Sequence, residues 1–192
     1  MRHQKRFLVN PFLLIGLVTA ILGGFAGTAG AQLPRIAPEP GIALPNWGVD
    51  ELQGSTVQKR DILNAYEKAI EQLEDGKCRD ALSNFDYVLD FVDDDPNVYY
   101  AAATAARCAR SFRSATGLYE STIEFDPANW EAYRYLGISH LALGDLESAT
   151  DALGALDLAK DECAEACPAE LESAYASLRK VVQKAEKMLA SP

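Results

Sequence analysis

The chain has 192 residues, of which 48% are hydrophobic, and a formal net charge of -10. This length fits one domain plus a targeting segment, and the hydrophobic content excludes a chain that is disordered throughout. So acidic a protein is also poorly suited to binding nucleic acid or an anionic membrane surface, because both are bound through Lys and Arg. The charge serves either solubility alone or the binding of a basic partner.

Residues 1–31 have the pattern of a signal peptide. A basic start is followed by an uncharged apolar run from Phe7 to Phe25, and the small residues Ala29-Gly30-Ala31 suit a signal peptidase. The basic start consists of Arg2, Lys5 and Arg6. We expect cleavage after Ala31 and export, to the periplasm, of a chain that no longer contacts the membrane. The alternative is an inner-membrane anchor, since residues 12–31 just reach across a bilayer at about 1.5 Å per residue.

Residues 32–54 are predicted to form a tether. Its prolines and glycines prevent a helix and favour an extended, polyproline-like conformation. They are Pro34, Pro38, Pro40, Gly41, Pro45, Gly48 and Gly54. Trp47, the one large apolar group in this segment, either packs on the protein's own domain or anchors a partner.

From residue 55 to Leu189 the composition predicts helices separated by short breaks. Ser55 and Gln58 form a capping box that predicts the first helix start. Breaks between helices are expected at Gly76, at 93–96, at Asp126-Pro127, at Gly144-Asp145 and at 161–167, before a last helix from Pro168. In the second of these breaks Asp95 is the expected N-cap and Pro96 the first helical residue, and Asp126-Pro127 are expected to play the same two roles in the third.

An internal period of 34 residues organises these helices. Asp80-Ala81, Ser114-Ala115 and Ser148-Ala149 recur at that spacing, and a large residue follows each Ala by four positions. In a pair of antiparallel helices, the small Ala lets the two backbones approach closely and the large residue fills the space beside it. The predicted repeat core is Ala81, Phe85, Ala115, Tyr119, Ala149 and Leu153.

These residues resemble the tetratricopeptide repeat (TPR) family. The third unit matches best, through Tyr133, Leu136, Gly137, Ala149 and Leu153, whereas His140 replaces the usual Tyr. The resemblance implies an all-α, right-handed solenoid of three tetratricopeptide-type helix pairs plus a C-terminal capping helix. The units are expected over residues 55–160, at about 62–95, 96–129 and 130–160, and the Cys-containing loop and capping helix over 161–192. Leu171, Tyr175, Leu178, Val182 and Leu189 are predicted to form the inward side of that last helix, and Glu172, Lys180, Lys184 and Glu186 its outward side.

All four cysteines lie beyond the signal segment, and an exported chain favours their oxidation. Cys78 opens the second helix of the first unit, and Cys108 closes the first helix of the second unit. These helices pack antiparallel, so the repeat geometry predicts a Cys78–Cys108 disulfide, with Cys163 and Cys167 closing a small loop. The alternative is reduced, buried thiols.

The sequence offers no catalytic constellation, so we expect no enzyme activity, no cofactor and no metal. Beyond residue 31 the only histidine is His140, which is predicted to lie in the core rather than to act as a base. Asp93, Asp94 and Asp95 lack the alternate spacing of a calcium loop and suit capping instead. Cys163 and Cys167 are too few ligands for a structural zinc ion.

The family resemblance implies that a protein or peptide partner binds the concave face, lined by the first helix of each unit. The positions in that register are Leu63, Tyr66, Ile70, Asn97, Tyr100, Thr104, Arg107, Glu131, Arg134 and Ile138. The family's carboxylate clamp is absent, because its positions hold Tyr66, Ile70, Ala101, Glu131 and Tyr135.

We therefore expect a non-enzymatic, protein- or peptide-binding scaffold of the bacterial cell envelope, with Tyr66 and Tyr100 as its aromatic anchors. The tether or the N-terminal helix filling the same groove is the competing interpretation of this face. The alternative function is a structural subunit of an envelope assembly that contacts partners by its convex face or its ends. The sequence leaves the oligomeric state open.

Overall fold

The computed structural model describes residues 56–163 and 166–191, and every regular element in these ranges is an α-helix. The predictions for residues 1–31, for the tether and for Ser55 lie outside the described residues. The helices are α2 (Thr56–Glu74), α3 (Cys78–Leu89), α4 (Pro96–Cys108), α5 (Phe112–Phe125), α6 (Trp130–Leu143), α7 (Leu146–Cys163) and α8 (Ala169–Ala190).

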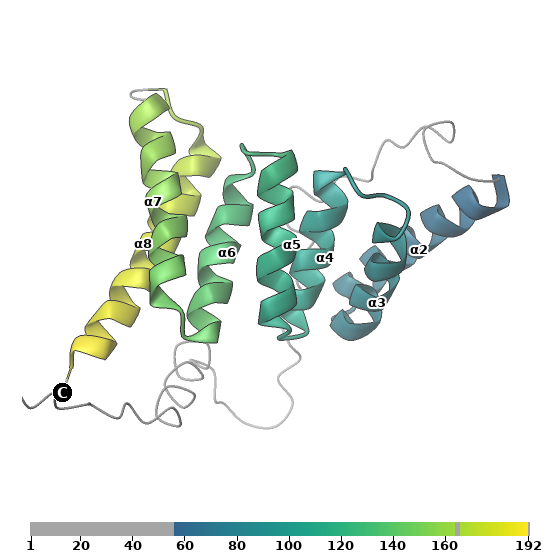
Figure 1. Ribbon diagram of the computed structural model, residues 1–192, viewed down its shortest axis with the longest axis horizontal. Helices are drawn as coiled ribbons and strands as arrows, with labels where there is room; N and C mark the ends of the chain where they lie inside the picture. Colours follow the sequence, from purple (N-terminus) through teal and green to yellow (C-terminus); the bar gives the residue numbers. More distant parts are fainter. Residues whose placement is uncertain (1–55, 164–165, 192) are drawn as a thin grey trace, which may run out of the picture. The chain divides into compact units, whose positions relative to one another are not determined.

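Each helix packs against the next one along the chain, as Figure 1 shows for α2 to α8. The pairs α2–α3, α4–α5 and α6–α7 correspond to the three predicted repeats. The last helix, α8, packs against both α6 and α7, so it covers the end of the third pair. The predicted all-α helical repeat with an added C-terminal helix is confirmed. Within the described ranges, no helix combines the length and apolar character needed to cross a bilayer.

The turn inside each helix pair uses a left-handed residue at the same phase of the repeat. Gly76 has φ 75° and Gly144 has φ 82°, as the predicted breaks require. The equivalent position of the second pair is Arg110, which adopts φ 62° although it carries a Cβ. A non-glycine residue in this region costs about 1–2 kcal/mol, so the repeat geometry imposes a strained backbone at Arg110.

The helix starts partly follow the prediction. Asp95 is the N-cap of α4, with its carboxylate accepting from the Asn97 amide at 2.8 Å, and Pro96 follows as predicted. The prediction that Asp126-Pro127 opens the next helix is wrong. The Asp126 side chain accepts from the Ala128 amide at 3.1 Å, which forms a local turn, and Asn129 becomes the N-cap of α6 instead. The last break also begins later than predicted, because α7 continues to Cys163.

The predicted repeat core is buried except at one position. Ala81, Phe85, Ala115, Tyr119 and Ala149 are fully withdrawn from solvent, whereas Leu153 is only partly buried. In the third pair the fully buried large side chain of α7 is Leu156, one helical turn further on. The equivalent positions of the first two pairs, Val88 and Thr122, are fully buried as well, so this position belongs to the core of all three pairs.

The C-terminal helix has the predicted inward side over most of its length. Leu171, Leu178 and Val182 are buried and Tyr175 is partly buried, but Leu189 is 53% exposed, which corrects the prediction for that residue. With 22 residues α8 is longer than α6 and α7, and its last turn extends past them (Figure 1).

Gly137 explains why α6 and α8 approach so closely. A Cβ built on it would lie 2.7 Å from a methyl carbon of Leu178, so any larger residue here would force the Leu178 side chain of α8 to move.

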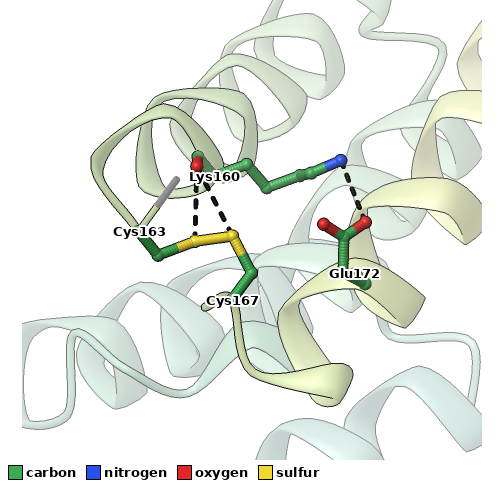
Figure 2. The surroundings of a disulfide bond; sticks show 4 residues. All are labelled: Lys160, Cys163, Cys167 and Glu172. Carbon is green, nitrogen blue, oxygen red and sulfur yellow. Dashed lines mark hydrogen bonds and ion pairs between the residues drawn. A yellow bond between two sulfur atoms is a disulfide. The ribbon is translucent and has the colours of Figure 1, made fainter. Parts of the chain in front are cut away.

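Both predicted disulfides are present. Cys78–Cys108 joins the start of α3 to the end of α4, with Cα atoms 5.6 Å apart, and so links the first two pairs. Cys163–Cys167 joins the end of α7 to the residue before Pro168, with Cα atoms 5.0 Å apart. Figure 2 shows both sulfur atoms against the Lys160 carbonyl oxygen, while the Lys160 ammonium pairs with Glu172 of α8 at 3.0 Å.

Candidate functional site

The predicted partner-binding residues lie on the first helix of each pair, α2, α4 and α6. We call them the inner-face residues: Leu63, Tyr66, Ile70, Asn97, Tyr100, Thr104, Arg107, Glu131, Arg134 and Ile138. All of them are buried or partly buried in the structure. Tyr66, Tyr100 and Thr104 are buried, and the other seven are partly buried.

The two tyrosines expected to anchor a partner are both withdrawn from solvent. Tyr66 is 1% exposed and packs edge-on against Phe85 of α3, with ring centroids 5.7 Å apart. Burial, together with the charge of Asp95, raises the pKa of the Tyr66 phenol above its usual value, so this group stays neutral. Tyr100 is 2% exposed. Both side chains are packed among the helices, and their role as anchors stays a prediction.

Around Tyr100 the structure gathers a set of residues that we call the tyrosine–arginine cluster: Tyr100, Arg107, Tyr119, Arg134 and Tyr135. The Tyr100 and Tyr119 rings meet edge to face at 5.9 Å, and Tyr119 stacks with Tyr135 at 6.0 Å. These three rings come from α4, α5 and α6, so the cluster connects the second and third helix pairs.

Two guanidinium groups complete the cluster. Arg107 and Arg134 lie over the Tyr135 ring, with their central carbons 4.0 Å and 3.7 Å from its centroid. Cation–π attraction of this kind is worth about 0.5–2 kcal/mol, the upper part of that range where the pair is desolvated. Tyr135 therefore orients both cations toward the same part of α6.

Polar contacts fix these side chains further. The Arg107 Nε donates to the Tyr119 hydroxyl oxygen at 3.2 Å, and the Thr104 hydroxyl lies 3.4 Å from the same oxygen. Arg134 donates to the Glu131 carboxylate through Nε at 2.9 Å and again through one terminal nitrogen.

Arg134 keeps its charge despite its position. Burial acts to lower the pKa of its guanidinium, but the hydrogen bond and the charge of Glu131 outweigh that effect and the pKa is raised. Among the described residues, the cluster brings two guanidinium groups together with the carboxylate of Glu131. This chemistry suits an anionic or carboxylate-bearing segment with apolar or proline side chains for the rings.

Sequence reasoning assigned Tyr119 to the repeat core and considered Tyr135 only as a missing clamp position. Both are central to the cluster, because their rings and the Tyr119 hydroxyl hold Arg107 in place. The sequence does place Tyr119 and Tyr135 on the two helices that follow Arg107. Whether their rings contact Arg107 depends on how these helices pack, which the sequence pattern does not specify.

The remaining candidates for chemistry have structural surroundings. His140 is mostly buried, and its Nδ1 lies 3.5 Å from a carboxylate oxygen of Asp145. That carboxylate also accepts from the Ser148 side chain and amide, and these bonds lower the pKa of Asp145. Among the described residues, no group of three or more His, Cys, Asp or Glu is arranged to hold a metal ion.

Comparisons with known proteins identify the fold. No family model matches the sequence, and no curated protein matches it. Solved structures do match. The structure of PcrH in complex with the chaperone binding region of PopD aligns with a TM-score of 0.57 and 20% identity, covering 71% of this chain and 96% of that one.

The first TPR of Spaghetti (RPAP3) bound to an HSP90 peptide aligns with a TM-score of 0.53 and 21% identity, covering 69% of this chain and 95% of that one. The Sgt2 TPR domain from Aspergillus fumigatus gives 0.53 at 13% identity, covering 69% and 85%. At these identities the likeness shows the fold alone, which is that of a TPR solenoid.

Proposed function

We propose that this protein binds a segment of another protein along the inner-face residues of α2, α4 and α6, as a non-enzymatic scaffold. The observation that carries this proposal is the tyrosine–arginine cluster. It gathers three packed tyrosines from α4, α5 and α6 around Arg107 of α4 and Arg134 of α6, two cations held by their own hydrogen bonds. Two solved structures of the same fold contain a bound segment of another protein, the chaperone binding region of PopD and an HSP90 peptide.

The chemistry of the cluster specifies the class of ligand. An extended or helical peptide with a carboxylate facing Arg107 and Arg134, and an apolar side chain beside Tyr100 or Tyr135, would satisfy both parts of the surface. A strongly basic peptide would meet like charge at this point of the face and is disfavoured.

We place this binding in an exported compartment. Both pairs of cysteines are oxidised in the structure, which fits an oxidising environment such as the periplasm. The sequence of residues 1–31 supports the same location. N-terminal sequencing of protein from the cell envelope tests it: a chain beginning at Gln32 is expected, whereas an intact Met1 in the membrane fraction would favour the anchor.

The partner is best identified by crosslinking in intact cells followed by mass spectrometry, with the protein carrying one substitution at a time. Arg107→Glu reverses a cation of the cluster, and Arg113→Glu reverses an exposed arginine on α5 that takes no part in it. We expect only the first change to reduce the crosslinked partner. If both variants and the parent give equal yields of crosslinked partner, the inner face is not the binding surface.

One observation favours the structural-subunit alternative. Tyr87 of α3 and Phe91, two residues past the end of α3, are 39% and 38% exposed, and their rings form an edge-to-face pair with centroids 5.2 Å apart. Neither is an inner-face residue. An exposed aromatic pair of this kind suits a protein contact away from the inner face, and losing the partner on Tyr87→Ala and Phe91→Ala but not on Arg107→Glu would support that alternative.

A further inference from the structure

The exposed aromatic side chains of the described residues gather at one edge of the array. Six large hydrophobic residues are exposed in the described ranges, and the three aromatic ones are Tyr87, Phe91 and Phe125, at 39%, 38% and 43%. The other three are leucines, one each on α6, α7 and α8. Single exposed leucines are ordinary, whereas exposed aromatic rings that gather in one place mark a contact surface.

Two ring pairs flank the start of α4. Tyr87 and Phe91 meet edge to face at the end of α3. Phe125, the last residue of α5, stacks on Tyr99 of α4 with ring centroids 5.6 Å apart. The Tyr99 hydroxyl donates to the Asp93 carbonyl oxygen at 3.1 Å, so the second pair reaches the turn that follows Phe91. We call the four aromatic residues Tyr87, Phe91, Tyr99 and Phe125 the aromatic edge.

The repeat generates this arrangement. Phe91 and Phe125 are 34 residues apart, so each occupies the same place at the end of the second helix of its pair. Both helices, α3 and α5, pack on α4, and Figure 1 shows the α3–α4 and α5–α6 turns on the same edge of the array. The third pair has Ala159 at this position, within α7, so the aromatic edge is confined to the first two pairs.

The aromatic edge is surrounded by acidic residues. Residues 80–106 contain six Asp or Glu and no Lys or Arg, and residues 114–133 contain four Asp or Glu and again no Lys or Arg. The exposed carboxylates that adjoin the rings along the chain are those of Asp90, Asp93, Asp94 and Glu124. Burial raises the pKa of the Tyr99 phenol, and the charges of Asp93, Glu124 and Asp94 raise it further. Three of the four carboxylates therefore lie near one ring of the edge.

The cations of the same helices are too far away to neutralise these carboxylates. The arginines of α3, α4 and α5 are Arg79, Arg107 and Arg113, each at the opposite end of its helix. Along α4, Arg107 lies about 17 Å from Pro96 at 1.5 Å per residue, which exceeds the screening length of about 8 Å at physiological salt. Among the described residues, no salt bridge involves any of the four carboxylates beside the aromatic edge.

We propose that the aromatic edge binds an arginine-bearing segment of another protein. A guanidinium group stacks on an aromatic ring through cation–π attraction and donates two parallel hydrogen bonds to a carboxylate. The edge offers both partners side by side, and a lysine ammonium makes poorer use of them because it lacks the planar fork. The net charge of -10 also attracts a basic partner over a distance. None of the four rings belongs to an inner-face residue, so this inference does not depend on the proposed function.

Two synthetic peptides of equal charge test the proposal. One is a short peptide that alternates Arg with Gly, and the other has Lys at every Arg position. Each is titrated into isotope-labelled protein that keeps its own N-terminus, and amide NMR signals locate the contact. We expect the arginine peptide to shift the signals of residues 87–94 and 124–126 saturably, and the lysine peptide to bind about two- to fivefold more weakly. Equal affinities, or shifts spread equally over α7 and α8, would reduce the contact to non-specific charge attraction and overturn the proposal.

Matched variants examine the rings. Phe91→Ala with Phe125→Ala should weaken binding of the arginine peptide at least about fivefold, because both exposed ring faces are lost. Leu158→Ala removes a side chain of α7 that is 67% exposed, and it should leave the affinity unchanged. Circular dichroism checks that each variant is folded. Unchanged affinity in the folded double variant would overturn the proposal.

A second pair of variants examines the charges and does not alter the rings. Asp93→Asn with Asp94→Asn should weaken binding severalfold. Glu147→Gln with Asp151→Asn removes the same charge from exposed positions of α7 and should have little effect. An equal loss in both would show that only the net charge matters and would overturn the proposal. Signals of the aromatic edge that shift with protein concentration alone would assign the edge to a second copy and overturn it as well.

Arg107→Glu separates this proposal from the proposed function. It should leave the affinity for the arginine peptide unchanged while reducing the partner that is crosslinked in cells. Peptide binding at the aromatic edge together with unchanged crosslinking would remove the inner-face proposal and leave the aromatic edge in place. Reduced crosslinking without any peptide binding at the aromatic edge would do the reverse.

Discussion

Removing the Cys78–Cys108 disulfide should destabilise the protein more than removing Cys163–Cys167. The two losses should also loosen opposite ends of the array. The first bridge closes a segment with a sequence separation of 30, and the second a separation of 4. In the chain-entropy model these loops correspond to about 3.6 and about 1.9 kcal/mol of lost unfolded-state entropy at 25 °C. At about 3 °C per kcal/mol for a domain of this size, replacing both cysteines of a pair by Ala should lower Tm by about 10 °C and about 5 °C, respectively.

Calorimetry of the two double variants without reductant measures this difference, and hydrogen exchange locates it. The Cys78–Cys108 bridge connects α3 to α4, so its loss should speed amide exchange in α2 and α3 before it affects α8. Each repeat contacts only its neighbours, so a cut at one boundary is felt mainly by the terminal pair beyond it. An equal Tm for the Cys78/Cys108 variant and the parent, or a larger loss in the Cys163/Cys167 variant, would refute this reasoning.

Three single substitutions test the packing. Ala115→Leu inserts a large side chain where α5 has no free space and should cost about 1–3 kcal/mol in urea unfolding, whereas Ala176→Leu on the exposed side of α8 should cost almost nothing. Gly137→Ala should destabilise the protein by about 1 kcal/mol, because overpacking against Leu178 of α8 costs more than the helix propensity of Ala gains. Gly117→Ala is the matched control: its new Cβ would have no atom within 4 Å, so it should stabilise the protein by a similar amount. Arg110→Gly should stabilise by about 1 kcal/mol by relieving the left-handed backbone, and a lower midpoint for this variant would contradict that account of the turn.

Much of the fold was predictable because a repeat fixes many positions at once. The 34-residue period placed Ala81, Ala115 and Ala149 at equivalent close crossings, and all three are buried. The same geometry placed Cys78 beside Cys108. Local competition decided what was missed: Asp126 has the chemistry of an N-cap, but its side chain turns the backbone at Ala128 and Asn129 caps the helix instead.

The candidate site was only partly predictable. The register of the repeat placed Arg107 and Arg134 on the inner side of the array, and the structure brings both to the Tyr135 ring. The burial of Tyr66 and Tyr100 could not be obtained from the register. The position of a residue in the repeat tells which way its side chain points from the helix. Its exposure to solvent depends instead on the side chains that pack around it.

The positions of the disulfides bear on how partner binding and stability are related in this chain. One bridge ties α3 to α4 and the other ties the end of α7 to Cys167, two residues before α8, and within the described residues none crosses from α5 to α6. The tyrosine–arginine cluster spans that middle region, with Tyr119 on α5 stacked against Tyr135 on α6. An occupant of the inner face therefore rests on the part of the array that no covalent link holds together. Since a ligand that binds only the folded state stabilises it, the partner should add most of its stability at this junction.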